Sequence, residues 1–262
     1  MTHCSMTRRS FLACAGMLVM IPLFEGAAFA ARAQKIPVLL YHDISGHNMD
    51  AYCILASDFA AQMEWLYEHG VRAVSLRDIE AGTVPDRSIV ITFDDGYASF
   101  LEYAYPLFQM YGFKATVNII GRYVGAYLPF RDNDNRPMLS WDEYRYLSTG
   151  GLIDFGCHTQ DLHVFQHRGA AGVPDEVVQN DLRTFQRIMK QELGKPSDIL
   201  AWPYGSYTER TVAIAREEGF RYLLTSNPGF MILEESRTEI PRLNVQGSIN
   251  LYGLESLIEV KK

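Results

Sequence analysis

The sequence predicts an α/β protein in which parallel strands and their covering helices curl into a distorted (β/α) barrel. Short apolar runs alternate with longer amphipathic segments, a pattern typical of strands joined by helical crossovers. Polar residues follow several of these runs directly, and α/β barrels build their sites at that end of a strand. The 262 residues, 48% of them apolar and without a repeat or a linker, suit one globular domain.

Strands and helices are expected to alternate from residue 37 onward. Runs rich in Val, Ile and aromatic residues favour strands, and a glycine after an amphipathic segment marks a helix end. These signals predict strands at 37–41, 73–75, 88–93, 115–120, 153–156, 199–202 and 222–225. They predict helices at 57–69, in the segment that ends at 111, and at 140–149, 177–193 and 208–218.

Two serines are expected to begin helices. Ser57 precedes the first amphipathic segment and is a suitable N-cap. Ser140 is followed three residues later by Glu143, which is the sequence pattern of a capping box.

Two adjacent carboxylates, Asp94 and Asp95, stand where the 88–93 strand meets a glycine turn. Neighbouring carboxylates repel each other unless a cation or a shared proton offsets their charge. One of them can therefore bind a metal while the other remains free to take a proton. Taken alone, an Asp-Asp-Gly sequence also suits an ordinary solvated turn.

A second polar cluster follows the 153–156 strand. His158 and His163 flank a short loop that contains Asp161. Imidazole is the commonest metal ligand, and two imidazoles with one carboxylate form a facial set that leaves open positions. With the preceding aspartates, this loop predicts a metal site.

Three motifs, in this order along the chain, resemble those of the polysaccharide deacetylases, carbohydrate esterase family four. They are Thr-Phe-Asp-Asp-Gly at 92–96, the loop from His158 to His163, and Trp-Pro-Tyr-Gly at 202–205. The resemblance extends from about residue 38 to residue 245 and implies the distorted barrel of that family. It also implies a metal-dependent hydrolase that removes acetyl groups from a polysaccharide.

The resemblance assigns roles to the polar residues. Asp95, His158 and His163 would bind one divalent metal ion, and Asp94 would act as general base. Zn²⁺ suits these ligand types, as do Co²⁺, Ni²⁺ and Fe²⁺. The backbone N–H of Tyr204 would stabilise the oxyanion.

Two departures from the common family pattern indicate a subgroup. The metal histidines are five residues apart rather than four, and no histidine follows His167 to serve as a late general acid. Both features are similar to those of the deacetylases of poly-β-1,6-N-acetylglucosamine, in which the acid lies on the first strand. Here the Tyr-His-Asp sequence at 41–43 offers His42, which Asp43 would orient. His167 is a second candidate for the acid.

A third departure concerns the residue that steadies the base. Many family members carry an arginine where this chain has Ala201, and Arg242 is a candidate to replace it from a late strand. A structural salt bridge is the alternative role for Arg242.

Three further residues receive supporting roles with open alternatives. Trp202 and Tyr204 form an aromatic wall for a sugar ring, unless Trp202 packs in the core. Asp161 supports a ligand histidine through a hydrogen bond, unless it caps the loop.

The sequence thus favours N-deacetylation of an exported N-acetylglucosamine polymer. The alternatives are deacetylation of peptidoglycan, a chitin-like chain or an O-acetylated polymer, and a non-catalytic glycan-binding protein of the same fold.

Residues 1–33 are predicted to be an export signal that precedes a deacetylase domain at 34–262. Arg8 and Arg9 stand before an apolar run of 14 residues, which is shorter than the ~20 needed to span a bilayer. Small residues follow, and the pattern resembles a twin-arginine signal. Export to the periplasm or outside the cell, without stable membrane insertion after cleavage, is expected. An uncleaved anchor or a buried N-terminal helix is the alternative.

Charge and cysteine content restrict the partners. Without residues 1–33 the chain has 21 basic and 30 acidic residues, a net charge near −9, which does not suit nucleic acid. A monomer acting on an N-acetylated polysaccharide is expected. Cys53 and Cys157 would pair in an oxidising compartment unless Cys157 packs beneath the site.

Overall fold

Buried apolar strands form one curled and mostly parallel sheet. The computed structural model describes residues 34–47, 50–82, 84–128, 136–163, 169–233, 235 and 237–258. The expected export signal lies outside these residues. The strands of the sheet are β1 (Lys35–Tyr41), β4 (Arg72–Ala73), β5 (Ser88–Phe93), β6 (Ala115–Ile119), β9 (Ile153–Cys157), β10 (Ile199–Ala201), β11 (Tyr222–Leu224), β12 (Phe230–Ile232) and β13 (Leu243–Asn244).

The parallel strands follow one another across the sheet in the order β11-β10-β9-β6-β5-β1. All six residues of β5 are buried, as a strand covered on both faces requires. Only β12 runs antiparallel, against the first residues of β1.

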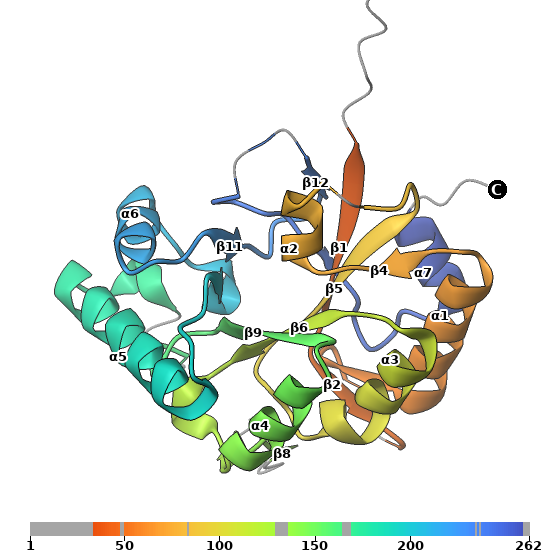
Figure 1. The fold of residues 1–262 in the computed structure, drawn as a ribbon, viewed down its shortest axis with the longest axis horizontal. Helices are drawn as coiled ribbons and strands as arrows, with labels where there is room; N and C mark the ends of the chain where they lie inside the picture. Colours follow the sequence, from red (N-terminus) through yellow and green to blue (C-terminus); the bar gives the residue numbers. More distant parts are fainter. Residues whose placement is uncertain are drawn as a thin grey trace, which may run out of the picture. The chain divides into compact units, whose positions relative to one another are not determined.

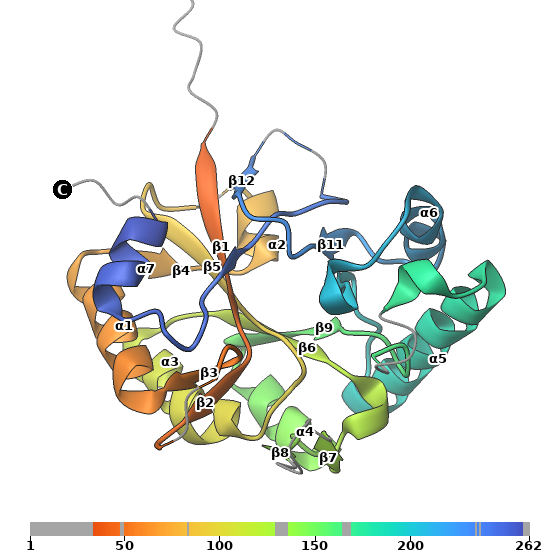
Figure 2. The same ribbon diagram turned by 180° about the vertical axis from the view of Figure 1, so that it is seen from behind.

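Helices pack around the outside of the curled sheet (Figure 1). They are α1 (Ala56–Glu68), α2 (Leu76–Glu80), α3 (Tyr105–Tyr111), α4 (Trp141–Thr149), α5 (Asp175–Leu193), α6 (Glu209–Glu217) and α7 (Leu251–Leu257). Viewed from behind, α7 lies beside α1 (Figure 2), and the Gln62 amide of α1 donates to the Ile249 carbonyl just before α7. None of the helices in the described part of the chain is both long and apolar enough to cross a bilayer.

Short elements complete the described part of the chain. They are the strand pairs β2 (Asp43–Ser45) with β3 (Cys53–Leu55) and β7 (Tyr127–Leu128) with β8 (Arg136–Pro137), the π-helical turn η1 (Phe100–Ala104), and the 3₁₀ turns η2 (Gly121–Tyr123), η3 (Ala170–Gly172) and η4 (Pro203–Gly205).

A late segment joins the two ends of the parallel strand series. Ile240 pairs with Leu224 of β11, and three residues later Leu243 of β13 pairs with Leu39 of β1. Residues 240–244 therefore lie between the first and last parallel strands. This closure gives the distorted (β/α) barrel that the sequence predicts.

The two predicted helix starts have different outcomes. Ser140 accepts a hydrogen bond from the backbone of Glu143, whose carboxylate accepts one from the Ser140 backbone at 2.7 Å, so the capping box is confirmed. Ser57 is not an N-cap, because α1 begins one residue earlier, after Leu55. The Leu55 side chain has no oxygen with which to cap a helix.

Candidate functional site

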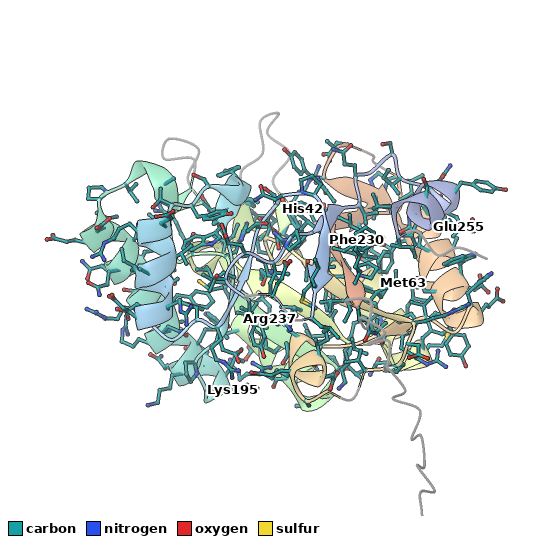
Figure 3. All side chains as sticks on the ribbon, turned by 90° about the horizontal axis from the view of Figure 1, so that it is seen from above. His42, Met63, Lys195, Phe230, Arg237 and Glu255 are labelled. Atoms are coloured by element: carbon teal, nitrogen blue, oxygen red, sulfur yellow. The ribbon has the colours of Figure 1, made fainter. Side chains whose placement is uncertain are left out.

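The carboxyl edge of the sheet gathers the polar residues that the sequence singles out. His42, Asp94 and His158 each stand one residue after a strand, β1, β5 and β9 respectively. These strands run parallel and lie within one sheet, so their carboxyl ends reach the same edge. In Figure 3, His42 lies in the upper half of the view, and Lys195, which precedes β10, lies at its lower edge.

Asp95, His158 and His163 come together as a candidate metal centre. The Oδ1 atom of Asp95 lies 3.5 Å from Nε2 of His158 and 3.3 Å from Nε2 of His163. One ligand atom from each residue lies within 4.8 Å of the other two. In the described part of the chain, no other such group of three occurs.

His158 is oriented by the backbone of the neighbouring strand. Its Nδ1 lies 2.8 Å from the carbonyl oxygen of Ala201, so Nδ1 carries the proton and donates it. Burial lowers the pKa of His158 to about 4, and the nearby His163 ring lowers it by a smaller amount. The His158 imidazole is therefore neutral at pH 7. Its Nε2 therefore presents a lone pair toward Asp95.

The three side chains fit a divalent metal ion. The buried Asp95 Oδ1 has no hydrogen-bond partner among the described residues, and a buried polar atom normally has one. Its distances to the two imidazole nitrogens exceed those of ordinary hydrogen bonds. A carboxylate with two imidazoles is a donor set for Zn²⁺ and for the neighbouring transition metals.

Asp94 has different surroundings from Asp95. Arg242 donates to both of its carboxylate oxygens, at 2.8 and 2.7 Å, and the Asn118 amide donates to Oδ1 at 2.7 Å. Burial alone would raise the pKa of Asp94, but the charge and hydrogen bonds of Arg242 outweigh it and hold the pKa well below its ordinary value. Asp94 is therefore ionised at neutral pH.

Arg242 reaches Asp94 from the segment that closes the barrel. Its side chain is 1% exposed, and its Nε donates to the Thr225 carbonyl at 2.7 Å. The residue that replaces the family arginine, Ala201, contributes its carbonyl to His158 instead.

Three non-glycine residues have a positive φ within the described part of the chain, and all three lie in these motifs. They are Asp95 at 75°, Thr159 at 67° and Tyr204 at 58°. Such backbone costs energy in non-glycine residues and is concentrated at functional sites. At Asp95 this backbone accompanies a carboxylate that lies next to both histidines.

The candidate acid and its neighbour have separate contacts. The half-buried His42 ring packs edge to face against Tyr52, with centroids 5.2 Å apart. The Asp43 carboxylate binds Ser99 and Arg136 rather than the His42 ring. The described contacts include no hydrogen bond from Asp43 to His42, so they do not show Asp43 orienting that ring.

The two supporting roles around His163 are also revised. Asp161 pairs with the exposed Arg122 at 2.6 Å, and it has no hydrogen bond to a ligand histidine. Trp202 is 1% exposed and stacks against Tyr207 in the core, so no sugar ring can lie on it. Tyr204 is 53% exposed, and its ring stacks on the His163 ring with centroids 4.7 Å apart, so of these two aromatic residues Tyr204 is the one with an exposed ring.

Cys53 and Cys157 are both buried and form no disulfide with each other, and the Cys157 sulfur accepts the Thr159 N–H beneath the site. His167, the second candidate for the acid, lies outside the described residues.

Asn118 and Asp181 belong to the site region but were not expected from the sequence. The Asn118 amide donates to Asp94, and Asp181 binds the loop between the two histidines. Each is a polar residue at a position of its strand or helix where the sequence pattern expects an apolar one. This departure from the pattern could have identified both residues from the sequence.

Comparison with known proteins agrees with this geometry. Residues 81–223 match the family described as "Polysaccharide deacetylase". A Staphylococcus aureus (strain MSSA476) protein named poly-beta-1,6-N-acetyl-D-glucosamine N-deacetylase is 26% identical over 214 residues, which cover 79% of this chain and 70% of that protein.

Two solved structures share the fold. IcaB from Ammonifex degensii superimposes with a TM-score of 0.72 and 24% identity, covering 87% of this chain and 98% of that chain. Streptococcus pyogenes deacetylase PplD, in complex with acetate, has a TM-score of 0.71 and 20% identity, with coverages of 86% and 99%. The family match spans more than half of the sequence and includes the paired aspartates and the histidine loop. The chain therefore belongs to the polysaccharide deacetylase family and is a deacetylase.

Proposed function

We propose that this deacetylase removes N-acetyl groups from an exported polymer of β-1,6-linked N-acetylglucosamine and releases acetate. The observation that carries the reaction is an Asp-His-His triad beside a carboxylate held ionised by a buried arginine. Two observations favour this polymer. The similar Staphylococcus protein is named for it. His42 also follows the first strand, where the motif resemblance to that subgroup would place the acid.

Asp95, His158 and His163 would hold the metal ion. When bound, a divalent ion supplies Lewis-acid chemistry at this edge, because it polarises an acyl oxygen and acidifies water. Zn²⁺ is the ion we propose, since the neutral imidazole of His158 and one carboxylate suit it.

Asp94 acts as the general base at Oδ2. Oδ1 already accepts from Arg242 and Asn118, whereas Oδ2 accepts only from Arg242 among the described contacts. A carboxylate oxygen accepts about two hydrogen bonds, so Oδ2 retains the place for a proton taken from the attacking water.

His42 acts as the general acid. It protonates the amine nitrogen as the carbon–nitrogen bond breaks, because an unprotonated leaving group would be an amide anion. The exposed Tyr204 ring lies against the sugar, and its backbone N–H donates to the developing oxyanion.

The test is release of acetate and free amine from β-1,6-linked N-acetylglucosamine oligomers by the zinc-loaded protein, with chitin oligomers in parallel. Asp94→Asn and His42→Ala should keep the metal and lose roughly a hundredfold or more in rate. Asp95→Ala should lose metal and activity together.

Each outcome has a distinct meaning. Activity on the β-1,6 oligomers that is lost in Asp94→Asn supports both reaction and polymer. Activity on chitin oligomers alone overturns the polymer and keeps the mechanism. No release from either substrate by metal-loaded protein supports another acetylated glycan or a non-catalytic glycan-binding protein. If the Asp94→Asn protein bound no metal, Asp94 would be the metal ligand and Asp95 the general base.

We also propose that residues 1–33 direct export by the twin-arginine route, since Arg8 and Arg9 precede the apolar run. Replacing both arginines with lysine should trap unprocessed precursor inside the cell, measured by fractionation and immunoblot. Continued export of the lysine variant would indicate the general secretory route.

A further inference from the structure

The loop that carries the two histidine ligands cannot be an α-helix. Helical residues rotate by about 100° each, so side chains five apart point roughly 140° away from one another. His158 and His163 are five apart, yet both Nε2 atoms face the same oxygen of Asp95. The loop therefore needs interactions other than helical hydrogen bonds to hold its shape.

Two of those interactions lie within the loop and its strand. The Thr159 N–H donates to the Cys157 sulfur at 3.2 Å, and the Leu162 N–H donates to the Thr159 hydroxyl at 3.2 Å. Both are long or weak hydrogen bonds. On the carbonyl side, the Arg122 N–H donates to the Gln160 oxygen at 2.8 Å. The N–H groups of Gln160 and Asp161, in the middle of the loop, need acceptors from elsewhere.

A carboxylate from α5 holds the middle of the loop. The Gln160 N–H donates to one oxygen of Asp181 and the Asp161 N–H donates to the other, both at 2.7 Å. Hydrogen bonds to an ionised acceptor are shorter and stronger than neutral ones. Asp181 is the residue outside the strand and loop that binds these two successive amides.

Asp181 also occupies a position where stability alone would favour an apolar residue. It is 9% exposed and lies on the buried face of α5 with Val178, Leu182 and Phe185. A carboxylate at such a position costs free energy unless its hydrogen bonds compensate. The compensation here comes from the ligand loop.

We propose that Asp181 is a positioning residue for the metal centre, holding the His158–His163 loop so that both imidazoles face Asp95. This inference rests on the proposed function, because it takes the triad to be the metal site. Groups that orient metal ligands typically contribute 10- to 100-fold in metal affinity.

The experiment measures Zn²⁺ affinity directly, by competition with a chromogenic chelator at near-neutral pH. Asp181→Asn keeps the side-chain shape, but its amide can accept only one of the two N–H groups well. Its Kd for Zn²⁺ should rise by about 10-fold or more, and Asp181→Ala should show a larger rise. With Co²⁺, the visible spectrum of Asp181→Asn should also change, because the geometry around the ion is altered.

Two variants of the same helix serve as controls. Leu182→Ala opens a cavity beside Asp181 and should lower thermal stability without changing the Zn²⁺ Kd. Asp175→Asn removes an exposed carboxylate that pairs with Arg210 and should change neither. A merely structural role for Asp181 predicts that Leu182→Ala and Asp181→Asn lose affinity alike.

The possible outcomes separate the two proposals. A Kd and a Co²⁺ spectrum for Asp181→Asn equal to those of the wild type overturn this inference and leave the proposed function intact. Equal losses of affinity in Leu182→Ala and Asp181→Asn also overturn it. A wild-type protein that binds no Zn²⁺ overturns the proposed function, and this inference with it.

Discussion

Adjacent residues Asp94 and Asp95 have separate chemistry because their backbones differ. Asp95 has a φ of 75°, which turns its carboxylate to the histidines while Asp94 faces Arg242. Two neighbouring carboxylates in one orientation would repel each other and share a proton. Here Asp94 accepts hydrogen bonds from Arg242 and Asn118 and is ionised, whereas Oδ1 of Asp95 has no hydrogen-bond partner among the described residues and is available as a ligand.

The ion pair between Asp94 and Arg242 is buried, so its loss should have a large effect. Arg242→Ala leaves the carboxylate without its partner, and we expect kcat to fall on the order of 100-fold as the base loses its position. The free energy of unfolding should fall by about 3–5 kcal/mol, measured by urea denaturation. If kcat were unchanged, Arg242 would have no role in the site.

Arg77 provides a matched control for that experiment. Like Arg242, it forms ion pairs with carboxylates, in this case those of Asp154 and Asp198. It does so from α2, away from the carboxyl edge of the sheet. Arg77→Ala should therefore reduce stability modestly and leave kcat unchanged.

Among the elements, α5 combines packing with support of the ligand loop. Its apolar positions cover the sheet, and Asp181 interrupts them. Burial raises the pKa of Asp181 from 3.8 to about 6. The hydrogen bonds that its carboxylate accepts from the Gln160 and Asp161 N–H groups lower the pKa, but by less.

The raised pKa of Asp181 makes stability depend on pH in a defined direction. The folded protein binds this proton more tightly than the unfolded chain, so the stabilisation is present below about pH 4 and is lost as pH rises through about 6. Asp181→Asn removes this contribution. In chelator, wild-type stability minus that of Asp181→Asn should fall by up to about 3 kcal/mol between pH 4 and 7. A constant difference, measured by urea denaturation at each pH, would contradict the assigned direction.

Element boundaries were predictable where local signals were strong. The predicted 88–93 strand agrees with β5 at both ends. The apolar run is bounded by charged residues on both sides, so its limits can be read from the sequence. The strands β12 and β13 were missed, since two or three residues carry no periodicity. Their pairing with β1 depends on tertiary contacts.

For the whole molecule, metal binding should be linked to folding. The triad joins β5 to the loop after β9, and the unfolded chain has no such arrangement. At free Zn²⁺ near 100 times Kd, linkage adds about 2.7 kcal/mol, so removing the ion should lower Tm by roughly 5–10 °C. Differential scanning calorimetry with and without chelator measures this. Asp95→Ala is the control, and its Tm should not respond to Zn²⁺.

The sequence by itself determined the fold class and most of the candidate site. His42, Asp94 and His158 follow strands directly, and Tyr204 lies in the turn after β10. Parallel strands bring such residues to one edge whatever their exact packing. Local pattern was sufficient because the position of each residue depends only on where its own strand ends.

Tertiary structure alone decided which residues support the site. Arg242 lies 148 residues from Asp94 and reaches it only because residues 240–244 close the barrel. Asp181 reaches the histidine loop because α5 packs beside it, and Trp202 turns into the core rather than toward substrate. These contacts depend on how distant elements pack, and no local spacing in the chain encodes that.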